Sequence, residues 1–245
     1  VRASVTNDVL LLCATGGEGA AVIEAMVHRA DERHATRTTY TGVLAGESCR
    51  LAVTGIAATN TAQALTREIE RARPRLVLQF GIGGAYPRGG LCIGQVAVAS
   101  EEHYGDVGVE APAGWLGMAD VGFPLVDTDP PVHNCLPMDG ALAARAGRLA
   151  GAAVGPFVTV NRCSGVAALG DEVYGRTLGI CESMEGAAAA HVCAQYGVPM
   201  VEMRAASNMV EDRDKSRWRI GDAIAAITRA TLAVMSRLDE LEEPR

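Results

Sequence analysis

The chain has 245 residues, of which 49% are hydrophobic and 21% charged, so it can bury a core and is not intrinsically disordered. Its 22 Lys and Arg against 29 Asp and Glu give a net charge of −7, which argues against nucleic acid and an anionic membrane as partners. We expect one domain over residues 1–245 and a cytoplasmic location, because the apolar run after Asp8 is too short for a signal peptide and no charge-free stretch can span a bilayer.

Cysteine and histidine are scattered along the chain. The seven Cys form no C-x-x-C motif, and the five His form no H-E-x-x-H motif. This pattern predicts reduced, buried thiols and no metal site.

The first half of the chain alternates between predicted strands and helices. Residues 8–14 (DVLLLCA) form a continuous apolar run typical of a strand buried on both faces, and Gly16, Gly17 and Gly19 follow it. The later expected elements are a helix over 20–29, a hairpin over 37–45 and 49–54, a helix over 58–73, a strand over 76–80, a glycine-rich turn and a strand over 93–99.

The second half begins with an irregular segment over 105–137, which is long enough to suggest a functional or interface role. The elements expected after it are a helix over 139–150, strands over 156–160 and 178–181, a helix over 186–196, a strand over 200–205, and a final helix capped by Asp222. Together these elements predict a three-layer α/β/α domain with a mixed central sheet.

The segment GIGGAY invites comparison with the dinucleotide-binding motif G-x-G-x-x-G. Tyr86 stands where the third glycine belongs, and a predicted strand follows where that motif requires a helix. We therefore expect a glycine-rich turn at the carboxyl end of a strand, either as a ligand site or as a simple tight turn.

Three polar residues follow three predicted buried strands: Glu18, Glu185 and Asn208. Strand ends converge on one rim of an α/β sheet, so these side chains can meet. Each also has an ordinary structural explanation, as an acid at a helix N-terminus or as a cap.

These segments together resemble the nucleoside phosphorylase/nucleosidase superfamily. SMEGAAAAHVCAQYGVPMVEMRAASN is similar to the part of that family in which a Met-Glu pair opens a helix and a later strand ends in Arg-x-x-Ser-Asp. FGIGG and ATGGEG resemble the family's phosphate- or water-side loop and its N-terminal catalytic loop. The ending SNMVEDRDKSRW is most similar to the futalosine hydrolases of menaquinone biosynthesis, relatives of the methylthioadenosine/S-adenosylhomocysteine nucleosidases.

The resemblance implies hydrolysis of the N-glycosidic bond of futalosine without a cofactor, with release of hypoxanthine and dehypoxanthinyl futalosine. It implies that Glu18 takes a proton from water and that Glu185 accepts the 2′ and 3′ hydroxyl hydrogens of the ribose. Asn208 replaces the Asp of adenine-specific members, and its amide can donate to O6 of hypoxanthine while accepting from N7–H. The other residues that it implies at the substrate are Gly83, Gly84, Met184, Arg204 and Ser207.

Two positions depart from the family pattern. Ile82 stands where the nucleosidases have Ser, and the base-stacking segment aligns only with Arg162, Cys163 and Ser164. Arg213, Lys215 and Arg217 are candidate cations for the carboxylate on the 5′ arm of futalosine.

Three alternatives to this function stay open. They are another purine nucleosidase, a phosphate-dependent purine nucleoside phosphorylase and a catalytically silent nucleoside-binding protein. The expected partners are a small purine nucleoside and further copies of the chain, in a dimer or larger homo-oligomer.

Overall fold

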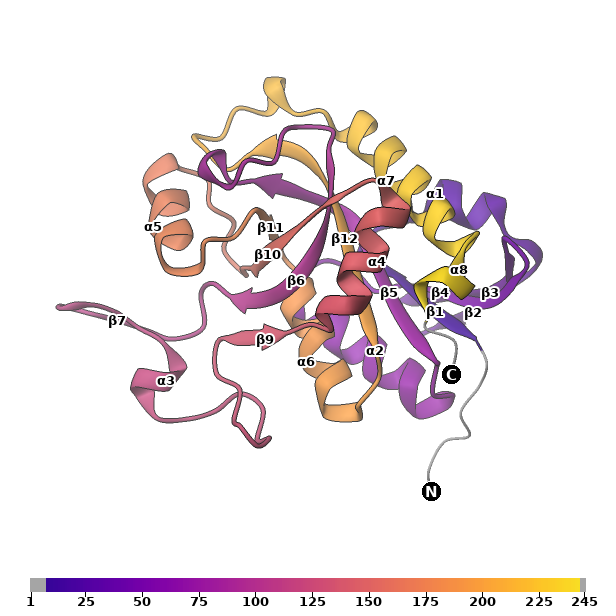
Figure 1. Cartoon of the computed structure of the whole chain (residues 1–245), viewed down its shortest axis with the longest axis horizontal. Coiled ribbons are helices and arrows are strands. Elements are labelled where there is room, and N and C mark those ends of the chain that lie inside the picture. The colour runs from indigo at the N-terminus through magenta and orange to yellow at the C-terminus, as the bar shows by residue number, and fades with distance from the viewer. Residues whose placement is uncertain (1–7, 243–245) are drawn as a thin grey trace.

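The computed structural model describes residues 8–242, so the expected domain over 1–245 extends past the described part at both ends. Its centre is a ten-stranded sheet in the order β11-β10-β6-β12-β5-β1-β4-β3-β2, with β9 paired to β6 (Figure 1). Parallel and antiparallel pairs both occur, which confirms the predicted mixed sheet. The strands are β1 Val9–Cys13, β2 Val27–His34, β3 Arg37–Leu44, β4 Glu47–Val53, β5 Leu76–Ala85, β6 Val96–Tyr104, β9 Cys135–Pro137, β10 Ala153–Thr159, β11 Cys181–Ser183 and β12 Met200–Met209.

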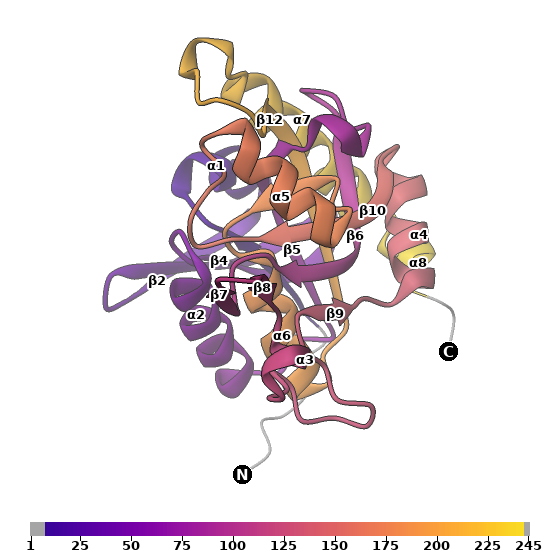
Figure 2. The same ribbon diagram turned by 90° about the vertical axis from the view of Figure 1, so that its left-hand side faces the viewer.

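Helices cover both faces of the sheet, which confirms the three-layer prediction (Figure 2). Successive side chains of β1 point to opposite faces, so Leu11 packs with one helical layer and Leu12 with the other. The first layer holds α1 Gly16–Ala25, α4 Gly140–Ala150, α7 Ile220–Met235 and α8 Leu238–Leu241; the second holds α2 Ala58–Arg71 and α6 Gly186–Tyr196. This double burial explains why β1 is apolar at every position.

Strand β5 does not end at Phe80 as predicted but continues through the glycines to Ala85. It pairs there with β11, so β5, β11, β10, β6 and β12 form a closed ring. A Cβ on Gly83 would lie 2.6 Å from Cys181 Sγ and 2.8 Å from the carbonyl oxygen of Glu182. The expected turn was therefore wrong: the glycines let β11 approach β5 closely within the sheet.

The first helix lies earlier in the chain than the predicted range of 20–29. Helix α1 begins at Gly16 because Thr15 caps it, and Val27–His34, expected to be partly helical, forms the exposed strand β2. The final helix begins at Ile220 with Arg219 as N-cap, so Asp222 lies in its first turn and is not the cap. Helix α5, Ala167–Thr177, was not predicted; its Val173 packs with Tyr86 near the ring.

The segment over 105–137 projects from the body of the molecule (Figure 1). It is largely irregular, as expected, but contains the short hairpin of β7 Val109–Ala111 and β8 Gly114–Leu116, the helix α3 Met118–Val121 and the sheet strand β9. Within residues 8–242, no helix is both long and apolar enough to cross a membrane.

Candidate active site

A cavity of about 550 Å³ opens at the carboxyl ends of β1, β5 and β12. Its volume suits a small-molecule ligand. Seven of the eight residues predicted to act in catalysis or to contact the substrate line it: Glu18, Gly83, Gly84, Met184, Glu185, Ser207 and Asn208. Segments far apart in the chain thus meet at the strand ends, as expected for an α/β sheet.

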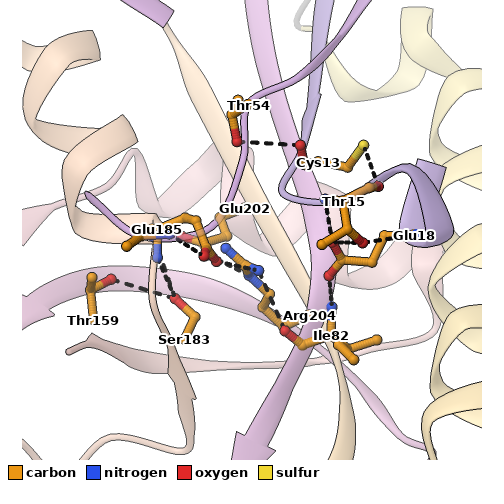
Figure 3. A network of polar contacts seen from close by, with 12 residues as sticks. Cys13, Thr15, Glu18, Thr54, Ile82, Thr159, Ser183, Glu185, Glu202 and Arg204 are labelled. Carbon is orange, nitrogen blue, oxygen red and sulfur yellow. Dashed lines mark hydrogen bonds and ion pairs between the residues drawn. The ribbon is translucent and has the colours of Figure 1, made fainter. Parts of the chain in front are cut away.

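Glu18 is both a helix cap partner and a wall of this cavity. It is 5% exposed, and its Oε2 accepts from the backbone N–H and the hydroxyl of Thr15, both at 2.9 Å. Its Oε1 accepts from the backbone N–H of Ile82 at 3.0 Å (Figure 3). Three donors hold the carboxylate in one orientation. The donor at position 82 is the backbone N–H, so this contact does not depend on the Ile side chain that replaces Ser.

Thr15 was missed as a site residue, although a sequence signal was present. Thr15 and Glu18 have the T-x-x-E spacing of a capping box, and both hydrogen bonds of that motif form. Gly81 was missed as well. A Cβ there would lie 2.7 Å from both Glu18 Oε1 and a guanidinium nitrogen of Arg204, so glycine makes room for this pair.

Glu185, 4% exposed, precedes the first residue of α6. Its Oε1 accepts from the backbone N–H of Ala57 at 3.0 Å, and its Oε2 accepts from Arg204 at 3.2 Å. Ala57 has a φ of 79°, a left-handed conformation that is uncommon for a residue with a side chain. The carboxylate is thus fixed by the loop before α2 and by β12, while its remaining lone pairs stay available for hydroxyl groups.

Arg204 lies behind Glu185 and is not among the residues that line the cavity. Its guanidinium, 1% exposed, also contacts Glu202 at 2.8 Å and the carbonyl oxygen of Ile82 at 3.4 Å. Burial by itself lowers the pKa of Arg204, but the charges of Glu202, Glu185 and Glu18 raise it above its usual value. The expected contact of Arg204 with substrate is therefore replaced by a contact with the residue expected to hold the ribose.

Asn208 lies inside β12, not beyond it as predicted. The register of β12 against β5 shifts between Ala206 and Asn208, which leaves Ser207 as the extra residue of a bulge. Asn208 Oδ1 lies 2.8 Å from the hydroxyl of Ser207, and its Nδ2 donates to the carbonyl oxygen of Met209 at 3.0 Å. These contacts fix the amide orientation, with one N–H and one lone pair still free for a ligand.

A buried cluster around Glu182 was not predicted. Glu182 accepts from the Tyr86 hydroxyl at 2.8 Å and from the backbone and hydroxyl of Ser164 at 2.9 and 2.6 Å. Burial, then the charge of Glu182, raises the pKa of Tyr86 above its usual value. Of the segment aligned with base stacking, Cys163 and Ser164 line the cavity and Arg162 does not.

The charges around the cavity are mainly negative. Its lining includes the carboxylates of Glu18, Glu182, Glu185 and Glu211 and, among the described residues, one cation, Arg213. The Arg213 guanidinium lies 4.6 Å from the ring centre of Trp218, another lining residue. Lys215 and Arg217 do not line the cavity, and Arg217 pairs with Glu211 at 2.6 Å.

One group of side chains in residues 8–242 lies close enough together to hold a metal ion: Glu101, His103 and Cys135. These residues belong to the paired strands β6 and β9, and none of them lines the cavity. The cavity itself contains polar groups suited to a sugar and a base.

Comparison with known proteins gives one consistent result. A family model described as the phosphorylase superfamily matches residues 8–240. A futalosine hydrolase from Streptomyces coelicolor is 38% identical over 160 residues, 63% of each chain, so the match spans just under two thirds of that relative. A futalosine hydrolase from Thermus thermophilus is 34% identical over 75% of this chain and 79% of its own.

The solved structures agree on the fold. A 5′-methylthioadenosine/S-adenosylhomocysteine nucleosidase from Neisseria meningitidis, in complex with methylthio-immucillin-A, superposes with a TM-score of 0.82 at 24% identity. The match covers 94% of this chain and 99% of that one.

Proposed function

The chain belongs to the phosphorylase superfamily, and from this membership we propose that it hydrolyses the N-glycosidic bond of futalosine. The products would be hypoxanthine and dehypoxanthinyl futalosine, in menaquinone biosynthesis. One observation carries the proposal: Glu18 in α1 and Glu185, the residue before α6, line one cavity together with the amide of Asn208. The substrate assignment is supported by the names of the Streptomyces and Thermus relatives.

The reaction requires three kinds of group, and the cavity offers each. Cleavage passes through an oxocarbenium-like ribosyl group, which a carboxylate at the 2′ and 3′ hydroxyls can hold, and Glu185 would do this. Glu18 would accept the proton of the attacking water. Asn208 would donate to O6 of the base and accept from N7–H as the purine leaves, and Met184 would pack beneath the sugar.

Water is favoured over phosphate as the nucleophile by the charge of the cavity. A phosphate dianion would meet the four lining carboxylates, and Arg213 is the one cation among the described lining residues to oppose their charge. Binding alone would not require a buried, oriented base such as Glu18, which counts against a silent nucleoside-binding protein.

The test of the function uses the unmodified protein. We expect it to release hypoxanthine from futalosine at full rate in phosphate-free buffer treated with a chelator, because no proposed step uses phosphate or a metal ion. Chromatography of the products from futalosine, inosine and methylthioadenosine, with and without phosphate, measures this. A sugar 1-phosphate product would establish the phosphorylase alternative, and preferential cleavage of methylthioadenosine would establish another nucleosidase.

Base selectivity should change in the variant Asn208→Asp. The 6-amino group of adenine is a donor, so it would leave the N–H of Asn208 unpaired. The carboxylate of an Asp at this position would accept from that amino group and would repel O6 of hypoxanthine. An unpaired polar group costs about 1–3 kcal/mol, so the ratio of kcat/KM for hypoxanthine over adenine nucleosides should fall about tenfold or more. If the ratio is unchanged, Asn208 does not select the base.

Arg213 is the cation best placed to recognise the 5′ carboxylate of futalosine. It lines the cavity, unlike Lys215 and Arg217, the two other candidates. Inosine lacks this carboxylate, so the product assay also tests the assignment: equal kcat/KM for futalosine and inosine would contradict it.

We also propose that the protein is located in the cytoplasm and forms a homo-oligomer. The seven cysteines are free, as they would be in a reducing compartment. The prediction that they are buried was wrong for Cys92 and Cys163, which are exposed. The projecting segment over 105–137 exposes Phe123 and Val109, apolar side chains that a second copy could cover.

A further inference from the structure

Two acidic side chains outside the cavity lie behind Arg204. Glu102 on β6 and Glu202 on β12 both have an exposed fraction of 0%, and one oxygen of each, Glu102 Oε1 and Glu202 Oε2, is buried without a hydrogen-bond partner among the described residues. A Cβ on Gly186, the first residue of α6, would overlap Glu102 Oε1 and both carboxylate oxygens of Glu202. The pair therefore fills the space directly beneath the helix that follows Glu185.

The two carboxyl groups differ in their other partners. Glu202 accepts from the charged guanidinium of Arg204 through Nε at 2.8 Å. Glu102 accepts from the neutral hydroxyl of Thr159 at 2.8 Å, and that hydroxyl accepts from the backbone N–H of Ala187 in α6. Burial, then the charge of Glu202, raises the pKa of Glu102 well above its usual value, which favours its protonated form.

We propose that Glu102 and Glu202 are a buried carboxylic acid–carboxylate pair that positions Arg204 and, through it, Glu185. A proton carried by Glu102 and donated to Glu202 would give both partnerless oxygens a hydrogen bond, Glu202 holds Nε of Arg204, and the same guanidinium holds Glu185 Oε2. The role of Glu185 in this chain of contacts rests on the proposed function. Glu102 and Glu202 are positioning residues, because neither lines the cavity.

The groups around Glu102 explain why the Glu102–Glu202 pair should keep one proton. The charged and titratable groups that face it are the carboxylate of Glu202 and the guanidinium of Arg204 on β12, the thiol of Cys181 on β11, the thiol of Cys135 on β9 and the phenol of Tyr104 on its own strand. Arg204 is the one cation among them and already neutralises Glu202 or Glu185. A second ionised carboxylate here would be a buried charge without a partner.

The test compares Glu102→Gln with the wild type by denaturant unfolding from pH 5 to pH 9. A group whose pKa is raised in the folded state stabilises that state at low pH and loses this contribution as pH rises toward the folded pKa. The wild-type unfolding equilibrium constant should therefore grow relative to that of Glu102→Gln by up to about tenfold per pH unit. Gln keeps the donor to Glu202 and removes the titration, so parallel pH profiles for the two proteins would overturn the proposal.

The matched variant Glu202→Gln should behave differently. It removes the charge opposite Arg204, so we expect a larger loss of kcat/KM than in Glu102→Gln. The wild type should also lose activity at alkaline pH as Glu102 ionises. This alkaline loss should be absent in Glu102→Gln and should remain in Glu202→Gln. Equal losses in the two variants would contradict the assigned proton position. If neither variant folds, infrared spectra of the wild type at pH 6.5 decide the matter, because the pair requires a protonated carboxyl band. The unfolding and infrared readouts do not depend on the substrate, so failure of the futalosine assignment would leave them unaffected.

Discussion

Replacing Glu18 with Gln should lower kcat about a hundredfold or more while leaving nucleoside binding measurable. General-base catalysis contributes a factor of this size, and the amide cannot take a proton from water. Single-turnover release of hypoxanthine gives the chemical rate, and titration of the variant with substrate gives its affinity. A kcat close to that of the wild type would remove Glu18 from the mechanism.

The structure also predicts a cost in stability for this variant. The carboxylate of Glu18 accepts from Thr15 on one oxygen and from the Ile82 N–H on the other, whereas Gln has a single acceptor oxygen. Either the donors of Thr15 or the Ile82 N–H therefore lose their acceptor in the variant, which should lower the free energy of unfolding by about 1 kcal/mol. Thr15→Ala breaks the same cap but keeps the carboxylate, so a much smaller loss of kcat in Thr15→Ala would separate the chemistry from the fold. Glu24→Gln, an exposed change on the same helix, controls for net charge.

Replacing Glu185 with Gln should lower kcat/KM about tenfold to a hundredfold. Hydrogen bonds to a charged acceptor are worth about 1.5–3 kcal/mol, and the carboxylate would hold two ribose hydroxyls as positive charge develops on the sugar. The loss should include kcat as well as KM, because the interaction strengthens in the transition state. Steady-state kinetics with futalosine measure both constants.

A 2′-deoxy substrate provides the control for Glu185. The wild type should strongly prefer the ribonucleoside, and Glu185→Gln should lose most of that preference, because the carboxylate is the proposed partner of the missing hydroxyl. If the wild type cleaves both forms equally well, Glu185 does not bind the 2′ hydroxyl.

Local sequence determined the elements whose patterns depend on nearby residues. The apolar run of β1 predicted a strand buried on both faces, and the small-residue helix after Met184 and Glu185 was predicted with the bounds that α6 has, Gly186–Tyr196. The polar residues after the strands were correctly expected to share one rim. In each case the prediction depended on the hydrophobic pattern or the side-chain types of a few neighbouring residues.

The glycines after Phe80 show what only the tertiary structure decided. Locally, GIGG is typical of a turn, but pairing with β12 along the segment, and with β11 at Gly84 and Ala85, makes it a strand. The bulge at Ser207 and the register that aims Asn208 into the cavity likewise depend on β5 as a partner.

The sequence by itself thus determined the layer architecture and several of the residues that gather at the cavity, though not Thr15 or Glu182. The tertiary structure decided how they are held: Arg204 behind Glu185 instead of at the substrate, and Glu102 against Glu202 beneath α6. The physical reason is that a buried charge requires a partner, and that partner can come from any strand packed against it. Sequence spacing carries no information about such contacts.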